Sequence, residues 1–96
     1  MSVYLVMDIE IVDEDAYSEY RRQVPAVIEQ FGGRYLARGG KAKNVDGDWQ
    51  PNRVVIVEFD SDAQARDFLT SSDYAPLLAI RHSAAVSRGI LVESAP

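Results

Sequence analysis

The chain of 96 residues contains no cysteine. This absence excludes disulfide bonds, thiolate zinc sites, iron–sulfur ligation and a thiol nucleophile. Histidine is nearly absent too, because His82 is the only one, and a single histidine cannot form a metal site by itself. Asp8 and Glu10 share a strand face, but no other carboxylates cluster with them to bind a cation. We therefore expect a protein without a bound metal or other cofactor.

Long hydrophobic runs and an excess of basic charge are also missing. No stretch approaches the roughly 18 apolar residues that a membrane-spanning helix needs, and no basic-then-apolar leader opens the sequence. The formal net charge of -5 argues against a nucleic-acid partner, because phosphate binding needs a basic face. The length predicts a single domain, residues 1–96. Together these features predict a cytoplasmic protein without a membrane or nucleic-acid partner.

Apolar residues recur with a period of two in several segments. Between Val3 and Ile11 every odd-numbered residue is apolar, which predicts a strand with one face on a core. Shorter β-type runs follow at residues 34–38, 53–59 and 86–92. The polar connection from Gly39 to Asn52 is long for a hairpin and carries the lone Trp49, so we interpret it as a mobile flap or as a contact with a partner chain.

Helical spacing occupies the remaining segments. Asp13 can cap a helix whose apolar residues continue in steps of three and four as far as Phe31. A capping box at residues 61–64 begins a second helix, and Ser72 can cap a further helical piece after it. The order β-α-β-β-α-β predicts a four-stranded antiparallel sheet with the helices on one face, which is the α+β ferredoxin-like sandwich.

The helices can cover only one face of this sheet. If Val55, Val57 and Phe59 face the helices, their neighbours in the strand point to the opposite side. Tyr4 and Val6 point there as well, so the open face carries an apolar patch that monomers rarely expose. We expect a homodimer that packs sheet against sheet through this face. The space between the two sheets would then form a mostly apolar pocket for a small molecule.

The chain resembles the family catalogued as domain of unknown function 1330, within the dimeric α+β barrel superfamily. The stretches that carry the resemblance are residues 17–20, 32–40, 51–59 and 71–81. Phe68 and Leu69 depart from the pattern, since relatives tend to carry a tryptophan and a second aromatic residue there. The resemblance implies the dimeric barrel fold. Members of the superfamily include cofactor-free monooxygenases, isomerases, haem enzymes and ligand-sensing regulators, so fold alone does not choose among these functions.

Polar residues on apolar strands and helices are the candidate ligand-binding groups. Glu58 could act as a general base in a dry cavity, with Arg38 or Arg81 holding an anion, or Glu58 could form a structural ion pair. Arg81 interrupts an apolar helical stripe beside Tyr74 and could reach a ligand carboxylate or pair within the chain. Tyr4 could line the pocket or pack in the dimer interface.

Two functions are therefore open from the sequence. The first is a cofactor-free enzyme that acts on a small organic acid or aromatic compound, with Glu58 as the best catalytic candidate. The second is a ligand-sensing or interaction module that performs no chemistry. An RNA-recognition domain shares the strand order, but residues 53–59 lack the aromatic residues that would stack bases on the open face.

Overall fold

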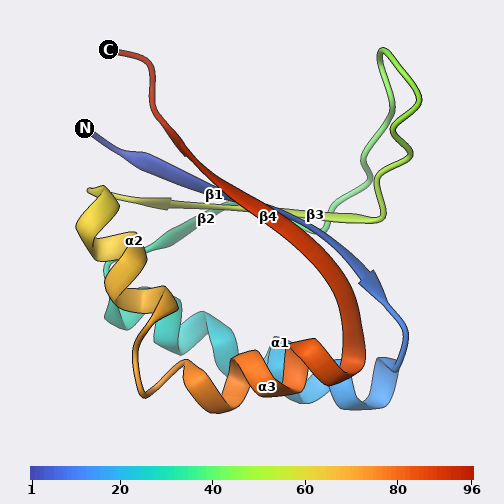
Figure 1. Cartoon of the computed structure of the whole chain (residues 1–96), viewed down its shortest axis with the longest axis horizontal. Helices are drawn as coiled ribbons and strands as arrows, with labels where there is room; N and C mark the ends of the chain where they lie inside the picture. Colours follow the sequence, from blue (N-terminus) through green and yellow to red (C-terminus); the bar gives the residue numbers. More distant parts are fainter.

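The computed structural model describes residues 1–96 as a four-stranded sheet with three helices on one face (Figure 1). The strands are β1 (Val3–Ile11), β2 (Arg34–Arg38), β3 (Arg53–Phe59) and β4 (Ala85–Glu93). The helices are α1 (Glu14–Gln30), α2 (Asp62–Leu69) and α3 (Ala75–Ala84). The sheet is antiparallel in the order β2-β3-β1-β4. The ferredoxin-like fold is thus confirmed, and no helix combines the length and apolar character needed to cross a membrane.

Side-chain caps fix the beginnings of the helices. The carboxylate of Asp13 accepts a hydrogen bond from the amide of Ala16 at 3.1 Å, and Ser61 Oγ accepts one from the amide of Gln64 at 3.1 Å. The expected cap at Ser72 is wrong. Ser71 Oγ instead accepts a hydrogen bond from the amide of Tyr74, at 3.0 Å, and Tyr74 is the N-cap of α3 without a side-chain cap of its own.

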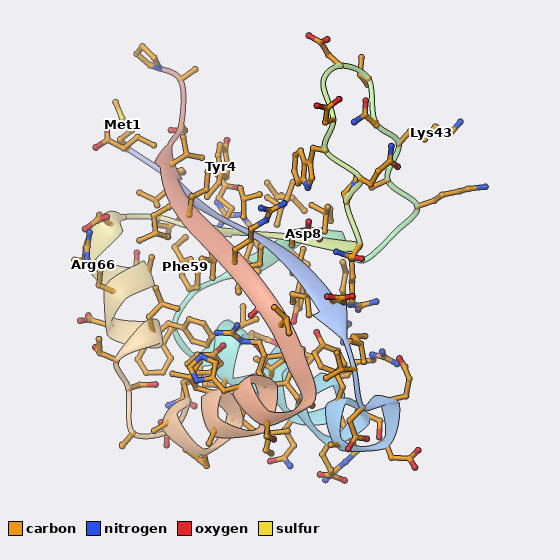
Figure 2. The ribbon with its side chains drawn as sticks, turned by 45° about the vertical axis from the view of Figure 1, so that its right-hand side comes forward. Met1, Tyr4, Asp8, Lys43, Phe59 and Arg66 are labelled. Carbon is orange, nitrogen blue, oxygen red and sulfur yellow. The ribbon has the colours of Figure 1, made fainter.

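The two faces of the sheet differ as the alternation predicts. Val3, Leu5 and Ile9 are buried against the helices, and Val57 and Phe59 join them from β3. In Figure 2 Phe59 lies between the sheet and the helices, whereas Tyr4 lies on the other side of the sheet. We call this other side the open face, and it exposes 62% of Ile90 and 44% of Val92.

A β-bulge interrupts the pairing of β2 with β3. Arg34 pairs with Glu58 and Tyr35 with Val57, but the next pair is Ala37 with Ile56, so Leu36 has no partner. An extra residue on one strand reverses the face of every side chain after it. Arg38 consequently pairs with Val55 and lies on the helix side of the sheet.

Candidate functional site

The five candidate residues from the sequence are divided between the two faces of the sheet. Tyr4 and Glu58 pair across β1 and β3 on the open face. Arg38, Tyr74 and Arg81 lie on the helix side. The expectation that Glu58 and Arg38 share one site is therefore wrong, and the bulge at Leu36 is the physical reason.

Glu58 has a partner within its own chain. Its carboxylate accepts a hydrogen bond from Arg34 Nε at 3.1 Å, and Arg34 also reaches Asp60 at 3.3 Å. The hydrogen bond that Arg34 donates to Asp60, followed by the charge of Glu58, raises the pKa of Arg34 above its usual value. Arg34 thus remains charged beside Glu58, and this ion pair is the structural alternative to a catalytic base at Glu58.

A cavity between α1 and the helix side of the sheet, which we call the α1–sheet cavity, gathers the aromatic and basic side chains. Its polar lining consists of Tyr17, Tyr20, Arg21, Tyr35, Arg38, Arg53 and Tyr74, and aliphatic residues and Phe68 complete the wall. Its volume is about 30 Å³, which is room for about one or two water molecules. A larger ligand must therefore displace side chains at its entrance.

Two of the three arginines of this cavity, Arg38 and Arg53, lack carboxylate partners. Arg38 and Arg53 form no ion pair, and Arg21 has only Glu14 at 3.6 Å on the surface. The guanidinium carbon of Arg38 instead lies 4.7 Å from the centroid of the Tyr35 ring. The Nε atoms of Arg21 and Arg53 are buried without a hydrogen-bond partner. The cavity is therefore electropositive and has unused donors.

Hydroxyl groups join the inner end of this cavity to Arg81. Tyr20 Oη lies 2.9 Å from Tyr74 Oη, and Arg81 Nε donates to Tyr74 Oη at 3.4 Å. Burial raises the pKa of Tyr20 well above its usual value, and the neighbouring Tyr74 adds to the shift. Burial also raises the pKa of Tyr35. Both phenols therefore stay protonated at neutral pH and can donate hydrogen bonds to a ligand oxygen.

A second hollow lies on the open face beside Asp8, and we call it the open-face pocket. It has a volume of about 260 Å³ and is lined by Val6, Met7, Asp8, Trp49, Val54, Arg88, Gly89 and Ile90. Trp49 Nε1 donates to Asp8 Oδ2 at 3.0 Å, and the amide of Asn52 donates to Oδ1 at 2.9 Å. Arg88 lies 3.9 Å from the same carboxylate. These contacts anchor the 39–52 loop, which rises from the sheet edge in Figure 1, onto the open face.

Sequence reasoning did not single out Arg21 and Arg53, which line the α1–sheet cavity. Arg53 begins β3 two residues before Val55, so strand alternation alone would have placed both on the helix side. Arg21 follows the buried Tyr17 and Tyr20 along α1, but nothing in the sequence indicates that it shares a cavity with Arg53. The proximity of Arg21 to Arg53 is visible only in the tertiary structure.

Metal-ligating residues do not converge anywhere in the fold. No three side chains of histidine, aspartate or glutamate are grouped so that they could hold an ion. His82 lies exposed near the end of α3, and Asp8 faces Trp49 and Arg88. Chemistry at the α1–sheet cavity would thus depend on phenols, guanidinium groups and the aromatic walls.

Solved structures share this fold over nearly the whole chain. A protein of unknown function from Rhodopseudomonas palustris, RPA0582, is 22% identical, with a TM-score of 0.80 over 99% of this chain and 83% of that one. SnoaB, a cofactor-independent oxygenase from Streptomyces nogalater, is 12% identical, with a TM-score of 0.72 over 99% and 94%. A dimeric ferredoxin-like protein of unknown function from Thermobifida fusca is 13% identical, with a TM-score of 0.57 over 96% and 90%. At these identities the likeness concerns the fold alone.

Comparison at the level of sequence identifies the family. No curated protein sequence matches the chain. The family model described as domain of unknown function, DUF1330, matches residues 2–95, almost the full length. The chain therefore belongs to the DUF1330 family.

Proposed function

We propose that this protein binds a small organic acid with an aromatic or apolar body in the α1–sheet cavity. The observation that carries the proposal is the absence of any acid in the wall of that cavity, although three arginines line it. The chain as a whole has a net charge of -5, so the basic wall of this cavity contrasts with the charge of the chain. Arginine binds carboxylates through paired hydrogen bonds, and the tyrosines supply flat surfaces for an apolar body.

The open face is the weaker candidate for the ligand. Asp8 and Glu58 are its buried or half-buried acids, and both are already bonded within the chain. A ligand there would have to displace these partners, whereas a carboxylate in the α1–sheet cavity would occupy donors that are otherwise unused. The ligand-binding residues we propose are thus Arg38, Arg53 and Tyr74.

We infer that the open face instead packs against a second copy of the chain. Tyr4, Val6, Val54 and Ile56 lie centrally on it, and the edge strand β4 adds Ile90 and Val92. The Thermobifida fusca neighbour is described as dimeric, which supports this arrangement in the same fold. A homodimer of this kind would enclose Trp49 and the open-face pocket between the two sheets.

The second candidate function is catalysis without a cofactor, favoured by the fold likeness to a cofactor-independent oxygenase. The Tyr20–Tyr74 hydroxyl pair, in which Tyr74 Oη accepts a hydrogen bond from Arg81 Nε, could polarise an oxygen of the bound compound. The alternative is ligand sensing without turnover. Oxygen consumption in the presence of a bound acid separates these two versions.

Native mass spectrometry of freshly purified protein tests the main proposal, because it reports the number of subunits and any retained small molecule together. A thermal-shift comparison of benzoate with neutral benzamide then tests the charge requirement. We expect benzoate to raise the melting temperature more. Arg38→Gln and Arg53→Gln should each weaken its binding roughly 10- to 100-fold, since a charged hydrogen bond contributes about 1.5–3 kcal/mol. Arg66→Gln, at an exposed ion pair on α2, is the matched control. Equal responses to benzoate and benzamide would refute an anion site.

A further inference from the structure

Arg81 is a buried cation without an acidic partner. It lies in the last turn of α3 and is 6% exposed. Its Nε contacts Tyr74 Oη, and its Nη1 donates a hydrogen bond to Ser87 Oγ on β4. No carboxylate lies within ion-pair distance, and Nη2 makes no hydrogen bond within the chain.

Burial of an unpaired charge is unfavourable, and the two hydroxyl groups compensate it only in part. The carbonyl end of α3 contributes some negative potential, because the residue sits in the final turn of that helix. Neither Tyr74 nor Ser87 carries the negative charge that would balance the guanidinium. The surroundings of Arg81 are therefore arranged to receive an anion.

A cavity next to Arg81 is open to such an anion. This β4-edge cavity has a volume of about 310 Å³ and lies between β4 and the helices. Its wall contains the basic residues Arg81, His82 and Arg88, the hydroxyl of Ser87, and no acid. Leu5, Met7, Leu69 and Leu91 make much of the remaining wall apolar.

The geometry points to a binding site for a short-chain aliphatic carboxylate in the β4-edge cavity, held by the guanidinium of Arg81 and the hydroxyl of Ser87. The carboxylate would occupy the free Nη2 and share Nη1, and its aliphatic chain would lie against the leucines. This site differs from the α1–sheet cavity in its basic residues, because Arg81 lines the β4-edge cavity whereas Arg38 and Arg53 line the other.

An NMR titration of ¹⁵N-labelled protein tests the site, with butyrate as the probe and butyramide as its neutral analogue. We expect butyrate to shift the Arg81 Nε–H and Ser87 amide resonances with a dissociation constant on the order of 1 mM. Butyramide should bind at least 10-fold more weakly. Ser87→Ala should weaken butyrate binding several-fold, and Arg81→Gln should abolish it, whereas Arg66→Gln should not change it.

Three outcomes would overturn the assignment. Butyramide could bind as well as butyrate, inorganic phosphate could shift the same resonances equally, or Ser87→Ala could leave binding unchanged. The Ser87 variant and the neutral analogue keep the test decisive if Arg81→Gln does not fold. Arg38→Gln and Arg53→Gln should leave the butyrate-induced shifts at Arg81 unchanged. The test of the butyrate site and the test of benzoate binding in the α1–sheet cavity can therefore fail independently.

Discussion

The hydroxyl oxygens of Tyr20 and Tyr74 lie 2.9 Å apart in the buried core, although 54 residues separate them in the chain. The contact joins α1 to the turn before α3, and the two rings meet edge to face with centroids 6.3 Å apart. A buried hydroxyl needs a partner, and each phenol provides one for the other. This pair therefore couples the packing of the helices to the inner wall of the α1–sheet cavity.

Removal of one hydroxyl should destabilise the fold. We expect Tyr20→Phe to lower the free energy of unfolding by about 1–2 kcal/mol, because Tyr74 Oη loses its closest partner while buried. Urea denaturation of Tyr20→Phe, Tyr74→Phe and the double variant forms a double-mutant cycle. Tyr35→Phe is the control, since the Tyr35 hydroxyl makes no hydrogen bond within the chain. A coupling energy near zero would mean that the two hydroxyls do not interact.

Alkaline pH should destabilise the protein through Tyr20. Burial raises its pKa in the folded state above the ordinary value of 10.0, so the unfolded chain releases this proton first as the pH rises. The stabilising contribution is fully present below pH 10 and is lost above it, by about 1.4 kcal/mol per pH unit for this one group. Urea denaturation from pH 9 to 11 should show a shallower decline for Tyr20→Phe than for the wild type. Parallel declines would contradict the assignment.

Gly39 lies against the guanidinium of Arg53, which lines the α1–sheet cavity. Gly39 has a φ of +76°, and an added Cβ would collide with the guanidinium of Arg53. We expect Gly39→Ala to lower the free energy of unfolding by about 1–2 kcal/mol and to displace Arg53, which weakens benzoate binding. Gly40→Ala is the matched control, because nothing lies within 4 Å of its added Cβ. Equal effects of the two substitutions would be the contrary result.

The hydrogen bond between Trp49 and Asp8 can be followed by fluorescence, since Trp49 is the only tryptophan. Asp8→Ala removes the acceptor of both the Trp49 indole and the Asn52 amide. We expect a red-shifted emission, faster proteolysis within residues 39–52 and a loss of about 1–3 kcal/mol in the free energy of unfolding. Asp48→Ala changes a carboxylate of the same loop that makes no bond, and it should leave the emission maximum in place. An unchanged spectrum in Asp8→Ala would show that the loop is held by other contacts.

The proposed dimer should depend on the open face. Ile90→Glu places a charge on that face at a side chain that is 62% exposed, so the isolated subunit should tolerate it. Sedimentation at micromolar concentration should then show single subunits, whereas the wild type should sediment as a pair. Val12→Glu is the matched control, because Val12 is 63% exposed but lies after β1, away from the sheet face. A wild-type protein that sediments as one subunit would refute the dimer.

Much of the architecture could be predicted because it depends on short-range patterns. The alternation in β1, the cap at Asp13 and the capping box at Ser61 each act within a few residues, and the structure confirms them. Alternation also predicted correctly which side chains of β3 face the helices. The site residues were predicted less well from the sequence. The convergence of Arg21 and Arg53 depends on how α1 packs across the sheet.

The sequence by itself determined the order of the strands and helices and the two-faced character of the sheet, since periodicity and capping are local properties of the chain. The tertiary structure alone decided that the bulge at Leu36 turns Arg38 toward the helices and leaves Glu58 with Arg34. It also decided that Tyr20 meets Tyr74 and that Arg81 is buried without an acid. Each of these depends on register or packing between distant segments, which no periodicity within one segment encodes.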